Sequence, residues 1–402
     1  MLSSVILLIT LLQQTCAFPR MLAERSGTLN VTSEQQELQS RGLLDLVHLI
    51  PTVLNLKPVL PIGRKRIPDA DHPFMPPGPN DIRGGCPGLN IMANYGYISR
   101  NGITDAGEVM YGMQEMLGFS FDIAAIILVL GIKSSFDLTT LKTSIGRTDS
   151  RTDGPLSGLF GTASGFFSKA SHNKFEVDGS LTRVDGYFAN GNTDHFDSNH
   201  WKQYRQLAID HFGGVMDFKF EGAARFMQYK ECREKNPECT WALGEQLPLY
   251  IAQAFVSDTL TSADENGNLL PPDVKSVETF FGIVENPDGT FSRGVGKLPP
   301  GPDGYWYRRS VPLTFVEQTL SLTQTLLPYP VVFGRNNGNL GHWDADLTDL
   351  RNIEQANVAC YILQQTRDPK DSKHANNPVL NKALGVLLSN TLQPIFEQLG
   401  CN

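Results

Sequence analysis

The sequence predicts a mainly α-helical protein with one large domain and long loops. Apolar residues recur at helical spacing in seven segments after residue 100, whereas alternating strand patterns are scarce. The chain contains 37 glycines and 25 prolines, and many of them separate the predicted helices, as at 283–305 and 335–342. Of the 402 residues, 41% are hydrophobic and 19% charged, a balance typical of a globular protein with a packed core.

The charge balance argues against nucleic acid as a partner. The net charge is −8, and binding to a phosphate backbone depends on clustered lysine and arginine. After the N-terminus, the longest aliphatic run covers only residues 123–130. A helix that spans a bilayer needs about 20 apolar residues, so the sequence predicts no transmembrane segment.

The first 17 residues are predicted to be a signal peptide. Residues 5–12 form a short apolar run, small or neutral residues follow, and cleavage is expected near Ala17. The weakly charged start leaves a buried N-terminal helix as the alternative. We therefore expect a secreted, extracellular protein, and Asn30-Val31-Thr32 offers a site for N-glycosylation.

Residues 18–66 are interpreted as an N-terminal extension or propeptide. Residues 35–50 have a helical pattern, and several prolines follow it. The extension ends in Arg64-Lys65-Arg66, which resembles a cleavage site for secretory proteases, although a solvated turn is an equally good interpretation. A proline-rich stretch begins the main domain, predicted to cover 67–402.

Seven helices are predicted in this domain. Thr104 or Asp105 is a suitable N-cap for the first of them. The segment 123–130 is apolar throughout, as expected of a buried core element. The predicted helices cover residues 105–117, 121–130, 201–212, 223–235, 243–259, 344–365 and 380–399.

Secretion would place the cysteines in an oxidising compartment. Five remain after removal of Cys16, so one thiol must stay unpaired. Cys232 could pair with Cys239 and Cys360 with Cys401, which would leave Cys86 free. The first pair is uncertain, because seven residues of continuous helix span about 10.5 Å, too far for a disulfide.

The segment around Cys86 carries the first sign of chemistry. Pro87 suits the first position of a helix, which places Cys86 at the helix N-terminus. Backbone N–H groups and the helix dipole stabilise a thiolate there. An unpaired thiolate is a suitable ligand for a soft metal or haem iron, although a buried inert thiol remains the alternative.

Four blocks in this order resemble the fungal haem-thiolate peroxidases, the family of chloroperoxidase and the unspecific (aromatic) peroxygenases. The resemblance extends from about residue 75 to 401, and the spacing agrees with the longer, secreted branch. The blocks are PGPNDIRGGCPGLN at 77–90, NYGYISRNG at 94–102, SIGR at 144–147 and FEVDGSLTRVD at 175–185.

The resemblance implies haem b with Cys86 as its axial ligand and hydrogen peroxide as the oxidant, without nicotinamide or flavin. A thiolate ligand donates electron density to iron and favours cleavage of the O–O bond. Gly85 departs from the commonest family motif, which has proline before the cysteine. Glycine still permits a close backbone approach, so we expect ligation to be retained.

The resemblance also implies a magnesium ion beside a haem propionate. Its ligands would be the Glu176 carboxylate, the Val177 carbonyl and the Ser180 hydroxyl, oxygen atoms of the kind that Mg²⁺ prefers. The alternative for Glu176 is a capping or surface carboxylate. A C-terminal disulfide of the longer branch corresponds in position to Cys360 and Cys401.

Peroxide activation in this family uses a glutamate as general acid and base. Leu243-Gly244-Glu245 resembles the segment that carries it, so Glu245 is the predicted catalytic residue, with a helix-surface glutamate as the alternative. The arginine of the longer branch is replaced by Glu238. Phe121 and Phe175 correspond to aromatic residues of the haem channel, and they are predicted to bind small apolar or aromatic substrates.

The function predicted from these residues is peroxide-dependent oxygen transfer to apolar or aromatic organic substrates. A haloperoxidase or one-electron peroxidase of the same family shares every motif and is the first alternative. The second is a secreted binding protein without catalytic activity, which the presence of both Cys86 and Glu245 disfavours.

Overall fold

The computed structural model describes residues 49–54, 56, 58–60, 62–155, 157, 163–346 and 355–401. The predicted signal peptide, the Asn30 sequon and nearly all of the predicted 35–50 helix lie outside these residues. Within them the mainly helical fold is confirmed, and the strands are only two or three residues long. The helices are α3 (Pro87–Asn94), α4 (Ala106–Glu115), α5 (Phe121–Ser134), α7 (Ser198–Phe212), α8 (Phe218–Lys235), α9 (Leu243–Phe255), α10 (Val274–Phe281), α11 (Phe315–Leu326), α12 (Gln355–Arg367) and α13 (Pro378–Leu399).

The strands fasten loops to one another rather than forming a central sheet. All their pairings are antiparallel: β1 with β7, β2 with β3, β5 with β6, and β4–β8–β9 as a three-stranded sheet. Their bounds are β1 Arg66–Ile67, β2 Ile103–Asp105, β3 Lys142–Ser144, β4 Thr240–Trp241, β5 Ile283–Glu285, β6 Phe291–Arg293, β7 Trp306–Tyr307, β8 Gly334–Arg335 and β9 Asp344–Ala345.

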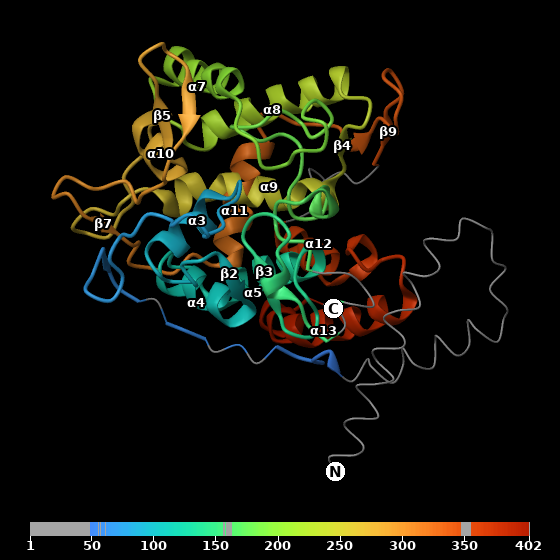
Figure 1. The fold of residues 1–402 in the computed structure, drawn as a ribbon. Helices are drawn as coiled ribbons and strands as arrows, with labels where there is room; N and C mark the ends of the chain where they lie inside the picture. Colours follow the sequence, from blue (N-terminus) through green and yellow to red (C-terminus); the bar gives the residue numbers. More distant parts are fainter. Residues whose placement is uncertain are drawn as a thin grey trace, which may run out of the picture.

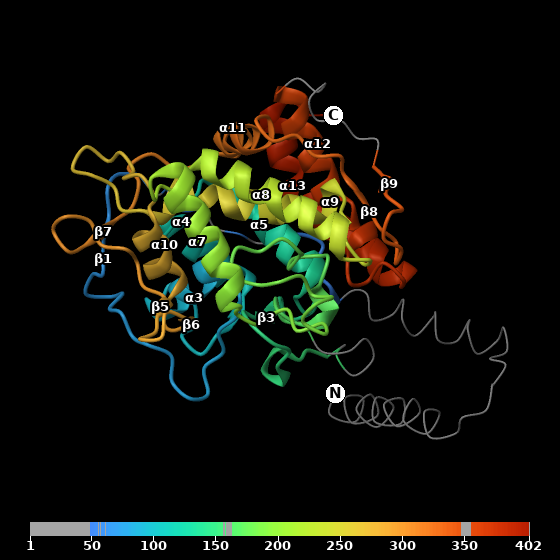
Figure 2. The same ribbon diagram turned by 90° about the horizontal axis from the view of Figure 1, so that it is seen from above.

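Helix α9 runs through the middle of the molecule. Figure 1 shows it between α7 and α8 on one side and α3, α4 and α5 on the other, and Figure 2 shows the same helices from above. Helices α8 and α11 pack against α9, while α12 and α13 pack against α5. Side chains from all these elements form one continuous hydrophobic core.

The central helices follow from local sequence. Helix α4 begins as predicted, because the Asp105 side chain accepts a hydrogen bond from the Glu108 N–H. Helix α5 is buried on nearly every side, which agrees with its apolar sequence, and it continues four residues beyond the prediction. The helix predicted over 344–365 is wrong at its start, because Asp344 and Ala345 form strand β9, and among the described residues α12 covers Gln355–Arg367.

The segment before residue 66 packs against the main domain. Ile50 and Leu54 are buried in the core, and the Val59 N–H donates to the Gln114 side chain. Arg66 pairs with Tyr307 in the β1–β7 ladder. The boundary predicted after residue 66 therefore falls inside a packed region, and cleavage there stays a prediction.

Two disulfides join parts of the described chain. Cys232 and Cys239 are bonded because α8 ends at Lys235 and the chain turns at Asn236, so the spacing of a continuous helix does not apply. Cys360 on α12 is bonded to Cys401, just after α13. The free cysteine among the described residues is Cys86.

Replacing Cys360 and Cys401 together with serine should destabilise the protein. The bond closes a loop with a sequence separation of 41 residues. By the loop-entropy model its loss lowers the free energy of unfolding by about 3–4 kcal/mol. Urea unfolding of the double variant against wild type measures the difference, and equal midpoints would contradict the expectation.

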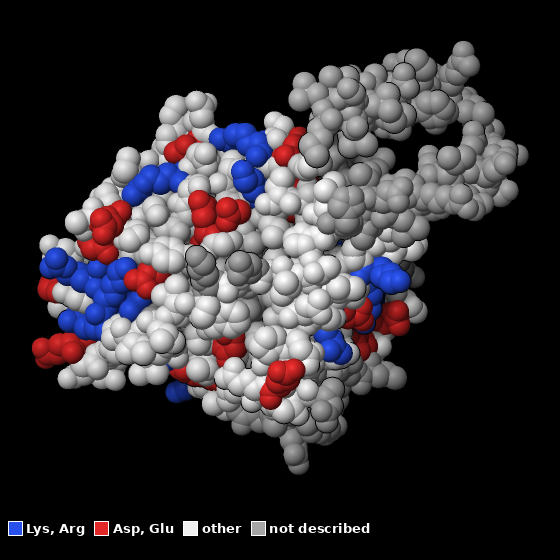
Figure 3. All heavy atoms as spheres, turned by 90° about the horizontal axis from the view of Figure 1, so that it is seen from below, with Lys and Arg blue, Asp and Glu red and all other residues white. Residues whose placement is uncertain are grey.

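The described helices include none that is long and apolar enough to cross a membrane. The face in Figure 3 carries lysine and arginine side chains beside aspartate and glutamate, rather than a continuous basic surface.

Candidate functional site

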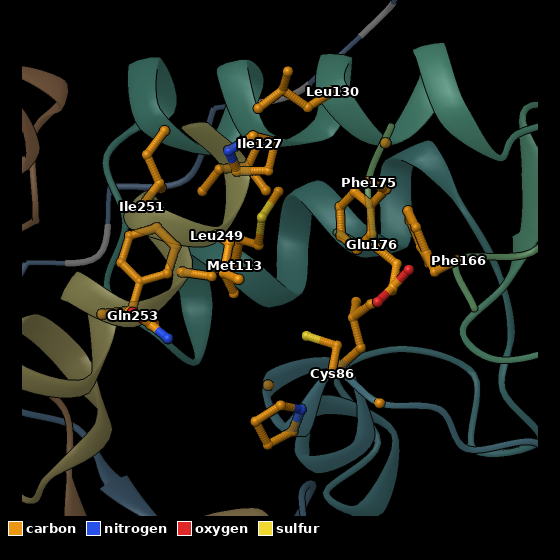
Figure 4. A pocket seen from close by; sticks show the side chains of 18 of the residues that line it. Cys86, Met113, Ile127, Leu130, Phe166, Phe175, Glu176, Leu249, Ile251 and Gln253 are labelled. Carbon is orange, nitrogen blue, oxygen red and sulfur yellow. The ribbon is translucent and has the colours of Figure 1, made fainter. Parts of the chain in front are cut away.

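A large apolar cavity lies between α3, α4, α5, α9 and α10. It encloses about 220 Å³, compared with about 20 Å³ for a second cavity near the start of α9. Its walls are mainly aliphatic, methionine and phenylalanine side chains. Figure 4 shows Cys86 with its sulfur directed into this space, Glu176 and Phe175 on one side, and Leu249, Ile251 and Gln253 on the other.

The local sequence places the Cys86 thiol at the N-terminus of α3. Cys86 is the N-cap, its backbone is extended, and Pro87 is the first helical residue, as predicted. Burial raises the pKa of the Cys86 thiol, while the N–H groups of Leu89 and Gly88 and the charge of Arg183 act in the opposite direction. Burial disfavours the negative thiolate, but a cation bound to the sulfur compensates that charge, so the thiol loses its proton when the cation binds.

The loop before Cys86 is held by close backbone contacts. The Gly84 N–H donates to the Asn90 side-chain oxygen, and the Asn90 amide donates back to the Gly84 carbonyl. At Gly85 a Cβ atom would lie 2.3 Å from the Arg183 guanidinium and 2.6 Å from Phe167. Gly85 therefore lets Arg183 and Phe167 approach the loop that carries Cys86.

Glu176 borders the same cavity and is held by a histidine and an arginine. One carboxylate oxygen lies 2.6 Å from His172 Nδ1, and Arg183 donates to the other at 3.2 Å. Burial alone would lower the pKa of His172, but its hydrogen bond to Glu176 and the nearby carboxylates raise it above the ordinary value. Val177 and Ser180 also line the cavity, so the structure brings together all three predicted magnesium ligands and Cys86.

Behind this loop lie two neighbouring acids, the buried Asp178 and the half-buried Asp185. The Asn236 amide donates to both Asp178, at 3.2 Å, and Asp185, at 3.1 Å. Burial, together with the charge of Asp178, raises the pKa of Asp185 to about 7. Cys232 lies close enough to complete a three-residue cluster, but its sulfur is in a disulfide and is not a metal ligand.

Asp185 should make the folded state less stable as the pH rises. Its raised pKa means that between about pH 4 and pH 7 the folded protein keeps a proton that the unfolded chain has released. Folding stability from this group therefore falls as the pH rises through that window. Thermal unfolding of Asp185→Asn and wild type from pH 4.5 to 8 should show the advantage of the variant growing with pH, and a constant difference would contradict the assignment.

Arg225 on α8 fixes the loop that carries Glu176 and Ser180. It is 1% exposed, and it donates to the Gly179 carbonyl at 2.8 Å and to the Gln246 side chain at 2.5 Å. Its guanidinium also lies over the rings of Trp241 and Tyr250. Arg225 thus ties one wall of the cavity to α8 and α9.

Glu245 does not lie in the cavity of Cys86, which corrects the prediction of its position. It lines the small second cavity, and Arg335 donates to its carboxylate at 3.0 Å. The cavity-lining part of α9 begins only at Pro248, one turn later. Burial raises the pKa of Glu245, and Arg335 opposes that rise.

The two predicted aromatic residues have different positions. Phe175 lines the cavity and its ring contacts Phe166. Phe121 does not line it: as the first residue of α5 it is half-buried, whereas Phe119, just before the helix, reaches the cavity. The position predicted for Phe121 was therefore wrong, and Phe119, two residues earlier, takes the place at the cavity.

The polar cavity residues that sequence reasoning missed include Arg183 and Gln253. Arg183 lies in the fourth sequence block, seven residues after Glu176, and it reaches Glu176 through the fold of a loop rather than along a helix. Gln253 lies on α9, whose cavity-lining residues are 248, 249, 251, 252, 253 and 255. These positions do not form one simple helical stripe, so the spacing of residues on α9 did not single out Gln253.

The chain is similar to a family model and to several known proteins. The model of the family described as "Peroxidase, family 2" matches residues 72–311, which include the cavity. An aromatic peroxidase of Fusarium equiseti is 28% identical over 314 residues, 73% of this chain and 70% of that protein. An aromatic peroxygenase of Cyclocybe aegerita is 29% identical over 320 residues, 78% and 76%. A dothistromin biosynthesis peroxidase of Dothistroma septosporum is 27% identical over 354 residues, 82% and 81%.

Proposed function

The chain belongs to peroxidase family 2, an oxidoreductase family that acts on hydrogen peroxide, and we propose that it is a secreted haem-thiolate peroxygenase. It would use hydrogen peroxide to transfer oxygen to apolar or aromatic organic substrates. The observation that carries the proposal is the free Cys86 thiol, directed into an apolar cavity from a helix N-terminus. A haloperoxidase would use the same elements, but no described feature of the cavity favours halide oxidation.

The cavity residues fit haem b. A large flat apolar group needs apolar walls, which the leucine, isoleucine and phenylalanine side chains provide. Cys86 would hold the iron, and the buried Arg183 would offer positive charge to a propionate. When bound, haem with a thiolate ligand supplies the iron chemistry that cleaves the O–O bond of peroxide.

The protein residues stabilise the Cys86 sulfur, hold the substrate and exclude water from the cavity. The N–H groups of Gly88 and Leu89 stabilise negative charge on the Cys86 sulfur, which tunes the electron density that a thiolate supplies. Phe119, Phe175 and the α9 side chains exclude water and hold an apolar substrate in the cavity. These contacts offer little hydrogen bonding, so we expect substrates to be selected mainly by shape and apolar surface.

Magnesium remains part of the proposal. The Glu176 carboxylate, Val177 carbonyl and Ser180 hydroxyl are hard oxygen donors at the edge of one cavity. His172 and Arg183 each contact one oxygen of the Glu176 carboxylate, so a bound ion would compete with these contacts. If Mg²⁺ binds here, its addition should raise the thermal midpoint of wild type but not of Ser180→Ala, while an equal rise in both would exclude this site.

Secretion is proposed from the N-terminal sequence and is supported by the two disulfides, which persist in oxidising compartments. Mass spectrometry of protein collected from the culture medium would show whether the mature chain begins near residue 18 or after residue 66.

The absorption spectrum of the purified protein tests the proposal. A haem-loaded protein should give the Soret position of a thiolate complex when it is reduced and exposed to carbon monoxide. Peroxide should then convert an aromatic substrate to a hydroxylated product. Protein that binds no haem would contradict the proposal and would favour a binding protein without catalytic activity.

A further inference from the structure

Gln253 is a buried amide without a partner, and it faces the cavity. It is 6% exposed, and neither its Oε1 nor its Nε2 has a hydrogen-bond partner among the described residues. Figure 4 shows it on the α9 side of the cavity, across the open space from Cys86. A buried amide left unpaired costs about 1–3 kcal/mol, so its retention in an apolar wall points to a ligand that completes its hydrogen bonds.

The charged groups of the cavity lie on the other side. Glu176 is the one carboxylate and Arg183 the one cation among the described lining residues, and they pair with each other. From α9 the described lining residues are Pro248, Leu249, Ile251, Ala252, Gln253 and Phe255. The wall opposite Cys86 therefore offers a hydrogen-bonding amide and no side chain that accepts a proton at neutral pH.

We propose that Gln253 is a positioning residue that hydrogen-bonds the small polar ligand, hydrogen peroxide, in the space opposite Cys86. This inference rests on the proposed haem site. The amide N–H would donate to a peroxide oxygen, and the amide oxygen would accept a peroxide O–H. An amide holds the ligand but does not take its proton, so among the described residues this wall offers a positioning group and no proton acceptor.

The alternative proton acceptor on the same helix is Glu245. It is eight residues before Gln253, about 12 Å along the helix axis, and it opens to the other cavity. A proton acceptor must come within hydrogen-bond reach of the proton, directly or through one water molecule. This separation favours Gln253 as the residue that meets the ligand.

Cyanide binding tests the inference without relying on turnover. Hydrogen cyanide must lose its proton when its carbon binds ferric haem, so a nearby base accelerates association. Stopped-flow mixing with cyanide from pH 4 to 9 would compare wild type with Gln253→Glu, Gln253→Met and Glu245→Gln. Each protein is first checked for the thiolate-type carbon monoxide spectrum.

In wild type we expect the pH profile of the cyanide association rate to show no inflection from a carboxyl group. Gln253→Glu should gain an inflection above the ordinary carboxyl pKa, because burial raises it, and above that pH association should be about 10²-fold faster. Gln253→Met should weaken the affinity for hydrogen peroxide about fivefold, measured as the peroxide concentration that half-saturates the initial rate. Glu245→Gln should behave as wild type.

Two results would overturn the inference. One is an inflection in wild type that Glu245→Gln removes, which would make Glu245 the acceptor. The other is an unchanged cyanide rate in Gln253→Glu with the thiolate spectrum intact. If wild type itself lacks the thiolate-type carbon monoxide spectrum, the haem site is refuted. Failure of the proposed function is thereby distinguished from failure of the role of Gln253.

Discussion

Replacing Cys86 with histidine is expected to abolish peroxide-dependent oxygen transfer and to shift the reduced carbon monoxide complex away from its thiolate-type Soret position. Cys86 is the free thiol of the described chain, and it opens directly into the cavity. Imidazole can still ligate iron, so haem is retained while the electron donation of the thiolate is lost. The variant should therefore bind haem but form no oxygenated product above the background without enzyme.

Met92 provides the matched control, because it lies on the same helix and also lines the cavity but is not proposed as a ligand. Met92→Leu conserves the apolar volume and should leave the spectrum unchanged. An unchanged spectrum in Cys86→His would show that the iron, if present, is held elsewhere.

Replacing Arg225 with methionine is expected to destabilise the protein by about 3–5 kcal/mol, a large effect for one residue. The change removes hydrogen bonds to the Gly179 carbonyl and the Gln246 side chain and leaves those groups buried without a donor. The loop that bears Glu176 and Ser180 should then lose its anchor. Urea unfolding measures the stability, and the haem content of the purified variant reports on the loop.

Arg205→Met is the control, since Arg205 is partly exposed and pairs with Glu278 at the surface. Partly exposed pairs contribute about 0–1 kcal/mol, so this change should be small. If Arg225→Met and Arg205→Met cost the same, the buried contacts of Arg225 do not hold the loop as described.

The sequence located one half of the candidate site. Cys86 could be predicted because its position is set locally by Pro87 and the start of α3. Glu176, Val177 and Ser180 lie within five residues and therefore reached the cavity together. Where neighbouring residues determine the geometry, a motif is sufficient.

The opposite half depends on packing between distant segments. Residue spacing on α9 alone does not show where the cavity begins, because that depends on where α9 lies relative to α4 and α5 across the cavity. Glu245 was therefore assigned to a site that Gln253 faces instead. The same reason explains why Arg183 was missed, since only the folded loop brings it to Glu176.

The fold class was easier to predict than the bounds of individual helices. Strongly apolar segments such as α5 were found because their burial is visible in composition. Helix α11 was missed, since it contains several threonines and serines, which have low helix propensity, and packing against α8 and α9 stabilises it. The Cys232–Cys239 bridge depended on the end of α8 at Lys235, and helix ends are the least certain feature of a sequence.

The most direct test of the central claim uses hydrogen peroxide labelled with ¹⁸O. The protein is incubated with the labelled peroxide and an aromatic hydrocarbon in unlabelled water, and the product is analysed by mass spectrometry. The account predicts a hydroxylated product that carries the ¹⁸O label, because the oxygen comes from peroxide. Unlabelled oxygen in the product, or coupled products without added oxygen, would contradict oxygen transfer and show a one-electron peroxidase.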